Sequence, residues 1–339
     1  MAEANDEDLT IRADELRPGD ILLCVFQPAG GLLYYLELIE QLIVDLSTPG
    51  KQLDYQDYLD LVKLLISLFD QDRYYHAAYW NGAKVFEEHS KDGLGAHDLD
   101  TYRDELTEVV RYVSDDGTEL GSPGLSAEPV QRQARALYDE LHPSGARGYS
   151  KWNCGLLLAL CVVRMSRTQM VDAFEGWLRA QIERDLPEWT KPAVGEALDR
   201  LFSADNKALL ADRLTEYATF VLRLFQDNDA MVCSQFVAHA YAGANDGTGY
   251  VIAKPTTPVL ATTSAALLAL PGTGGLGDGD LEGVLVELAG SLERLPPPPL
   301  SAPAPSVPLE QWAGIDDLYT PSDLSRSRNT RFMGRLQLA

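Results

Sequence analysis

Residues 74–89 read YYHAAYWNGAKVFEEH, and this stretch decides the fold that the sequence predicts. A run rich in Tyr, Ala and Trp meets a run with Val and Phe through the dipeptide Asn81-Gly82, a strong signal for a two-residue hairpin loop of type I′. With that loop, His76 lies directly opposite Glu87, with Cβ atoms roughly 5 Å apart. The hairpin therefore predicts an imidazole that is oriented by a carboxylate.

Residues 231–241, MVCSQFVAHAY, supply a nucleophile for this base. An apolar lead-in, a cysteine and then helix-forming residues place Cys233 at the first turn of a helix, where the positive end of the helix dipole stabilises a thiolate. His239 follows six residues later and points about 240° around the helix, so it is a poor base for this thiol. We therefore expect a triad of Cys233, His76 and Glu87.

Four motifs, taken in chain order, resemble the circularly permuted papain-like fold of the NlpC superfamily, in its YiiX-like branch. They are LRPGDILL at 16–23, HAAYW at 76–80, VFEE at 85–88 and CSQFV at 233–237. The segment YTPSDLSRS at 319–327 is similar to the closing segment of that branch, so the resemblance runs from about Leu16 to Leu324 with large unmatched insertions. It implies that the histidine and the acidic residue lie on neighbouring strands and that the cysteine comes last.

The resemblance also implies residues near the site. Asp20 is expected to fix the turn that enters the first strand, and the resemblance places it near the triad. Tyr149-Ser150 stands where the family usually has Tyr-Asp, and Tyr149 could line an acyl pocket or be an ordinary interfacial tyrosine. Ser234 is a further near-site residue, and Gln235 replaces a glutamate that commonly follows Cys-Ser.

The predicted reaction is attack by the Cys233 thiolate on a carbonyl through a covalent thioester acyl-enzyme. His76 accepts the thiol proton and later protonates the leaving group, Glu87 holds the imidazolium, and the Cys233 N–H is the first oxyanion donor. With this triad, the resemblance implies amide hydrolysis or lipid acyl chemistry, and we expect a cysteine-dependent peptidase or amidase. A lipid-directed thioesterase, phospholipase or acyltransferase, and a non-catalytic binding scaffold, are the alternatives that the sequence leaves open.

The charge and apolar content of the sequence limit the classes of partner and the location that we expect. A net charge of -23 argues against nucleic acid and anionic membrane surfaces as partners. The resemblance implies a peptide, an amide or an acyl-lipid as the substrate. The start, MAEANDEDLT, has no signal-peptide pattern, so we expect a cytoplasmic protein. The longest apolar run, roughly Cys154 to Val163, is shorter than the ~20 residues of a membrane span, so no transmembrane segment is expected.

Cysteine and histidine spacing gives no sign of a cofactor. The four cysteines lack CxxC spacing and no histidines stand four residues apart, so we expect no disulfide, no metal and no other cofactor. Cys24, Cys154 and Cys161 are interpreted as core cysteines.

Periodicity predicts an α+β fold in a single domain, 1–339, with a small antiparallel sheet and extensive helical insertions. The expected strands are Ile21–Phe26, Tyr74–Trp80, Ala83–Glu88 and Glu108–Ser114. The expected helices are Leu32–Leu46, Tyr55–Phe69, Gln131–Leu141, Trp152–Met165, Gln169–Arg184, Ala193–Phe202, Lys207–Gln226, Leu281–Leu295 and the cysteine helix. A Pro-rich connector is expected over 296–308.

Two groups of these helices are predicted insertions, a helical hairpin at 32–70 and a helical segment at 166–228, whose surfaces could hold a protein partner. The hairpin joins the first strand to the His76 strand and so is expected to cover the site. Leu61, Leu64 and Leu68 are additional apolar residues on its second helix. They either complete the core against the helical insertion or line an acyl channel.

Overall fold

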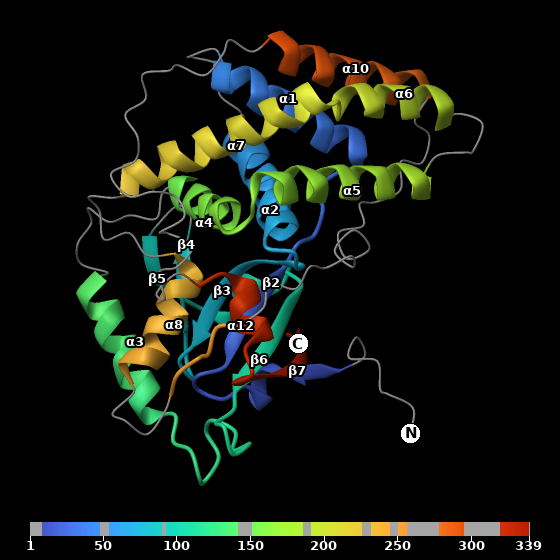
Figure 1. The fold of residues 1–339 in the computed structure, drawn as a ribbon. Coiled ribbons are helices and arrows are strands. Elements are labelled where there is room, and N and C mark those ends of the chain that lie inside the picture. Colours follow the sequence, from blue (N-terminus) through green and yellow to red (C-terminus); the bar gives the residue numbers. More distant parts are fainter. Residues whose placement is uncertain are drawn as a thin grey trace.

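A seven-stranded sheet and a body of helices stacked above it make up the protein in a computed structural model (Figure 1). The structure describes residues 9–47, 54–89, 93–141, 151–185, 191–225, 232–244, 250–255, 278–294 and 319–338. The predicted connector at 296–308 lies outside the described residues. Within the described part of the chain, none of the helices combines the length and apolar character needed to span a bilayer.

The strands form one mixed sheet in the order β1-β7-β6-β2-β3-β4-β5. Their bounds are β1 Thr10–Arg12, β2 Ile21–Val25, β3 Tyr74–Trp80, β4 Val85–His89, β5 Gly93–His97, β6 Thr107–Tyr112 and β7 Thr330–Gln337. The α+β prediction is confirmed. The small, wholly antiparallel sheet is wrong, because β1, β5 and β7 were not expected and β1 pairs with β7 in parallel.

The two ends of the chain meet at the β1–β7 pair, where Thr10 lies beside Arg335. Gly334 has a φ of +136°, and a Cβ there would stand 2.9 Å from the backbone of Leu9. Only glycine fits this close approach without strain. β7 has mixed burial and a polar composition, so its sequence lacks the strong alternation by which an isolated strand is recognised.

The predicted helices agree with the structure to within a few residues. The helices are α1 Leu32–Ser47, α2 Tyr55–Phe69, α3 Glu128–Leu141, α4 Lys151–Arg164, α5 Arg167–Asp185, α6 Lys191–Leu201, α7 Ala204–Phe225, α8 Cys233–Gly243, α10 Asp278–Arg294 and α12 Pro321–Arg326, with the 3-10 helices η2 Ala13–Glu15 and η3 Leu99–Tyr102. Of these, α12 and the two 3-10 helices were not predicted. We call α1, α2, α4, α5, α6, α7 and α10 the helical body. The cysteine helix α8 and α3 instead pack together beside the sheet (Figure 1).

The hairpin of β3 and β4 has a different register from the predicted one. Trp80 pairs with Val85, where a two-residue loop would have paired it with Ala83, so four residues, 81–84, form the loop. Asn81 does not take the positive φ that a type I′ turn requires, and its side chain accepts the N–H of Lys84 at 2.7 Å. The direct pairing of His76 with Glu87 is therefore wrong.

The shift of register nevertheless preserves the faces of the hairpin. Because side chains alternate with period two, a slip of two residues moves Glu87 from opposite His76 to a diagonal position on the same face. A slip of one residue would have separated the two side chains. The predicted partnership therefore survives in a different geometry.

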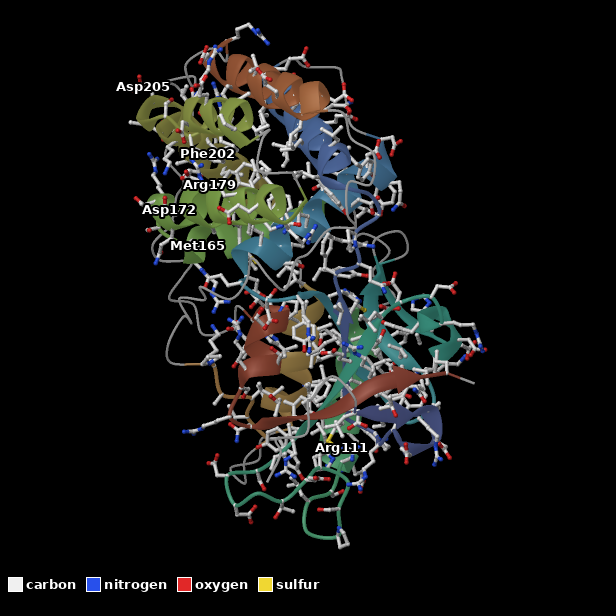
Figure 2. All side chains as sticks on the ribbon, turned by 90° about the vertical axis from the view of Figure 1, so that its right-hand side faces the viewer. Arg111, Met165, Asp172, Arg179, Phe202 and Asp205 are labelled. Carbon is white, nitrogen blue, oxygen red and sulfur yellow. The ribbon has the colours of Figure 1, made fainter. Side chains whose placement is uncertain are left out.

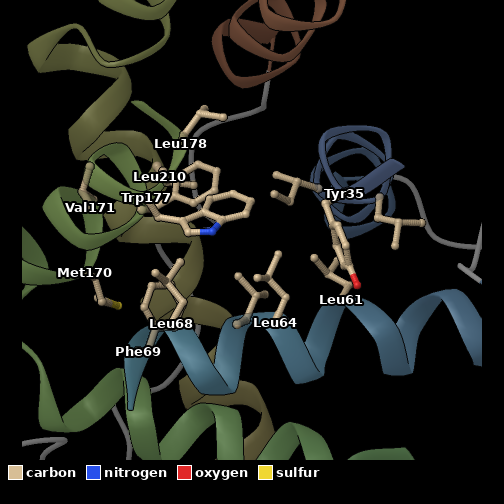
Figure 3. Close-up of a cluster of buried hydrophobic side chains, with 14 of the residues drawn as sticks. Tyr35, Leu61, Leu64, Leu68, Phe69, Met170, Val171, Trp177, Leu178 and Leu210 are labelled. Carbon is tan, nitrogen blue, oxygen red and sulfur yellow. The ribbon is translucent and has the colours of Figure 1, made fainter. Parts of the chain in front are cut away.

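The helical body has its own apolar core. Leu61, Leu64 and Leu68 are completely buried in it, and Figure 3 shows Leu64 and Leu68 projecting from α2 toward Trp177 of α5, with Leu61 beside Tyr35 of α1. These leucines thus complete the core against the helical insertion, the first of the two predicted roles. The two helices of the predicted hairpin pack mainly on other partners, α1 along α10 and α2 along α4.

A partly buried polar cluster joins the helical body to α12. Arg164, the last residue of α4, forms a two-pronged pair with Asp323 at 2.8 Å for both bonds. Asp70, the C-cap of α2, accepts a hydrogen bond of 2.5 Å from the Ser322 hydroxyl. Burial and the nearby negative charge of Asp323 raise the pKa of Asp70 to about 6. The closing segment is thereby fixed to α2 and α4.

Replacing Leu64 by alanine should lower the free energy of unfolding by about 2–5 kcal/mol, because a fully buried side chain leaves a cavity. Leu9→Ala is the matched control, since Leu9 is 43% exposed and its truncation should change stability by less than about 0.5 kcal/mol. Urea denaturation of both variants measures the difference. Equal losses would contradict the packing of α2.

Asp70→Asn should change the pH dependence of stability. The pKa of Asp70 is higher in the folded protein, about 6, than its ordinary value of 3.8, so the folded state binds the proton more tightly and loses stability as pH rises from about 4 through about 6. An amide does not titrate, so the variant should gain up to about 3 kcal/mol relative to the wild type across that range. Urea denaturation at pH 4.5 and 7.5 measures this gain, and parallel stabilities would contradict it.

Candidate active site

Cys233 begins α8, as predicted. Val232 is the buried N-cap residue, with extended backbone, and its N–H donates to the side chain of Gln235 at 3.0 Å. Gln235 therefore closes the first turn of the helix. The thiol stands where the aligned peptide dipoles of α8 favour negative charge.

The Cys233 thiol contacts the backbone of β3 at a point where β3 is not paired with β4, because only two residue pairs join these strands. These pairs are Tyr79 with Phe86 and Trp80 with Val85. Nearer the start of β3, the backbone N–H of Ala77 donates to the Cys233 sulfur, and the N–H of Ser234 donates to it as well. The first turn of α8 thus adds to the edge of β3 where β4 has diverged.

His76 stands between the thiol and the carboxylate. Its Nε2 donates to Oε2 of Glu87 at 2.8 Å, and the ring also forms a hydrogen bond with Cys233. Nδ1 is therefore the ring nitrogen left for the thiol. The side chains of His76 and Glu87 are 15% and 6% exposed, so the contacts are shielded from water. The structure brings the three predicted triad residues together.

The charges of this triad favour an ion pair. Burial alone would raise the pKa of the Cys233 thiol, but the positive charge and hydrogen bond of His76, with the two backbone N–H groups, hold that pKa below its ordinary value. Burial alone would lower the pKa of His76, but Cys233 and Glu87 raise it well above its usual range. A thiolate beside an imidazolium is the arrangement that makes a cysteine nucleophilic.

The chain matches no protein-family model, no curated protein and no solved structure.

Glu87 has neighbours that the sequence did not reveal. The Tyr102 hydroxyl donates to the same oxygen, Oε2, at 2.5 Å. Burial alone would raise the pKa of Glu87, but hydrogen bonds from His76 and Tyr102 and the charge of His97 lower it. His97 lies at the end of β5, whose Gly95 is opposite Glu87.

Cys24 is buried, as expected of a core cysteine, but it also lies directly opposite His76 on β2. Burial raises its pKa to about 12, which keeps it a neutral thiol. Cys161 is buried in the helical body, where burial and Asp70 raise its pKa well above the usual value. The side chain of Cys154 lies outside the described residues. Among the three described cysteines, Cys233 alone has a lowered pKa.

Asp20 fixes the turn before β2 and does not join the triad. It accepts the Arg17 N–H at 2.8 Å and pairs with Arg111 through two bonds of 2.7 Å. Cys24 lies four residues further along β2, or about 13 Å away. Figure 2 shows Arg111 in the sheet part of the molecule, at the end away from the labelled Asp172, Arg179 and Asp205 of the helical body. The near-site position that the resemblance implied for Asp20 is therefore not observed.

Ser234 and Tyr149 are the remaining residues that were expected near the site, and the structure describes only Ser234. The Ser234 hydroxyl donates to the carbonyl of Tyr319 at 2.6 Å, so its side chain ties α8 to the closing segment, and only its backbone N–H serves the thiol. Tyr149 lies outside the described residues.

Cys233 should be alkylated at neutral pH in preference to the other described cysteines. Cys233, Cys24 and Cys161 are similarly buried, so the thiolate fraction decides, and labelling of Cys233 at pH 7 should exceed that of Cys24 by at least about 100-fold. Iodoacetamide labelling followed by peptide fragmentation measures this ratio at each residue. Comparable labelling of Cys24 would contradict the assigned ion pair.

Proposed function

We propose that this protein is a cysteine-dependent hydrolase, a peptidase or amidase, that acts through a thioester acyl-enzyme on Cys233. The observation that carries the proposal is the continuous set of hydrogen bonds from the Cys233 thiol to His76 and from His76 to Glu87. A nucleophile, a base and a group that orients the base are the minimum that acyl transfer by a thiol requires.

In the proposed reaction the Cys233 thiolate attacks the substrate carbonyl and forms a carbon–sulfur bond. The N–H of Cys233, at the start of α8, donates to the resulting oxyanion. His76, as imidazolium, gives its proton to the departing amine or alcohol, and then takes a proton from the water that hydrolyses the thioester. Glu87 stays ionised throughout and stabilises the charged imidazole.

We also propose that the sheet and α8 form a circularly permuted papain-like core of the NlpC type, close to the YiiX-like branch. The chain order supports this: the histidine on β3 comes first, the acid on the adjoining β4 second, and the cysteine at the start of α8 last. The helical body would then be an addition to that core.

A lipid-directed thioesterase, phospholipase or acyltransferase is the second candidate, and the surroundings of the thiol favour it. Val232 and Cys233 belong to the apolar cluster of the helical body, whereas Phe236 and Tyr241 further along α8 belong to that of the sheet. An acyl chain would meet hydrocarbon side chains on the helical side of the thiol.

The covalent intermediate can be tested with nitrophenyl esters of short and long acyl chains and with peptide amides of aminocoumarin. Acid quenching and intact-mass measurement should show an acyl adduct on wild-type protein, and none on Cys233→Ala. His76→Ala should slow acylation about 10²–10⁴-fold. Glu87→Gln should be milder, about 10–100-fold, because an amide still accepts the imidazole hydrogen bond but does not neutralise its charge.

The variants should also combine non-additively, since the three groups act as a unit. Adding Glu87→Gln to His76→Ala should slow acylation little further. Turnover of the peptide amides would support the peptidase, and turnover confined to long-chain esters would support lipid chemistry. An adduct that persists in Cys233→Ala, or no adduct on any substrate, would favour the non-catalytic scaffold.

A further inference from the structure

One oxygen of Glu87 receives two hydrogen bonds. Oε2 accepts from Nε2 of His76 at 2.8 Å and from the hydroxyl of Tyr102 at 2.5 Å. Both Glu87 and Tyr102 are buried, so water cannot replace a donor that is lost. A buried carboxylate stays ionised only where such donors compensate for the hydration it has given up.

Tyr102 is held in place before any substrate arrives. It ends the 3-10 helix η3, whose last turn is closed by the N–H of Arg103 donating to the Asp100 carbonyl at 3.1 Å, and its own carbonyl accepts the N–H of Glu105 at 3.1 Å. Its ring is buried in an apolar cluster with Trp80 and Val85, on the face of the sheet away from α8. The phenol therefore approaches Glu87 from a rigid position.

We propose that Tyr102 is a positioning residue of the Cys233 site. It keeps the Glu87 carboxylate charged and aimed at His76, and it thereby sets how far the pH can fall before the Cys233 thiolate is protonated. This inference rests on the proposed function. It adds a fourth residue to the proposed triad, one that acts through Glu87 and does not touch the reacting atoms.

The charges of Glu87, His76 and Cys233 decide how the loss of the Tyr102 hydroxyl changes the protonation of the site. Burial and the adjacent carboxylate raise the pKa of Tyr102 well above its usual value, so it remains a neutral donor at every working pH. Without its hydroxyl, the pKa of Glu87 rises and the carboxylate takes up a proton at a higher pH. The imidazolium of His76 then loses its counter-charge, and the Cys233 thiolate is protonated more readily.

The test is the rate of Cys233 alkylation as a function of pH in Tyr102→Phe, which keeps the buried ring. The acid-side midpoint should move up by about one pH unit, so labelling well below the wild-type midpoint becomes about tenfold slower, while labelling well above both midpoints changes less than about twofold. Tyr74→Phe is the matched control. It removes a 2.6 Å bond between a buried phenol and the buried carboxylate of Glu108, and its midpoint should stay at the wild-type value.

A second measurement separates this role from general loosening of the fold. In a Glu87→Gln background, Tyr102→Phe should cause no further shift of the midpoint, because the amide has no charge to maintain. The inference is overturned if Tyr102→Phe leaves the midpoint unchanged, if Tyr74→Phe moves it equally, or if the shift persists in the Glu87→Gln background. An ordinary cysteine profile in the wild type would overturn the proposed function itself, and this inference with it.

Discussion

The contact between the first turn of α8 and the edge of β3 is the constraint on which the site depends. The Cys233 sulfur accepts the N–H of Ala77 and also bonds to the ring of His76, the preceding residue on that strand. β3 is in turn held by β2, which lies against it from Ile21 to Val25. The sheet thus fixes the position of the Cys233 thiol. The backbone of β3 carries both the base, His76, and the Ala77 N–H that contacts the thiol.

This contact lies at the boundary of two apolar cores. The start of α8 packs with the helical body, and the rest of the helix packs on the sheet with α3. The closing segment reinforces the junction, since Ser234 bonds to Tyr319 and Asp323 pairs with Arg164. The helical body and the sheet therefore both pack on the short helix α8, and the Cys233 thiol lies where the two cores meet.

Local signals were enough to predict most of the site, because its parts are short and periodic. The β3 limits, the start of α8 and the shared face of His76 and Glu87 all follow from patterns within a few residues. The register did not, because Asn81-Gly82 favours a tight loop and the side chain of Asn81 instead closes a loop of four residues. His76 and Glu87 were still predicted on the same face because the register differs by two residues, an even number.

The contacts that were not predicted join segments that are distant in the sequence. Tyr102 belongs to a single turn of 3-10 helix, which has no periodicity to recognise. Cys24 faces His76 because β2 pairs with β3, and α1 and α2 lie between these strands in the chain. No pattern around either residue indicates its partner, so the packing of the folded chain decides both.

The pairing of β1 with β7 has a consequence for the order in which the chain can fold. The partner of Thr10–Arg12 is β7, the last of the described strands in chain order, and Gly334 admits the backbone of Leu9 at a distance that a side chain would prevent. The loop that this pairing closes contains all the other strands of the sheet, so its entropy is lost only when the intervening sheet is already assembled. During synthesis β1 must therefore wait for β7, and the sheet is completed only after β7 has emerged from the ribosome.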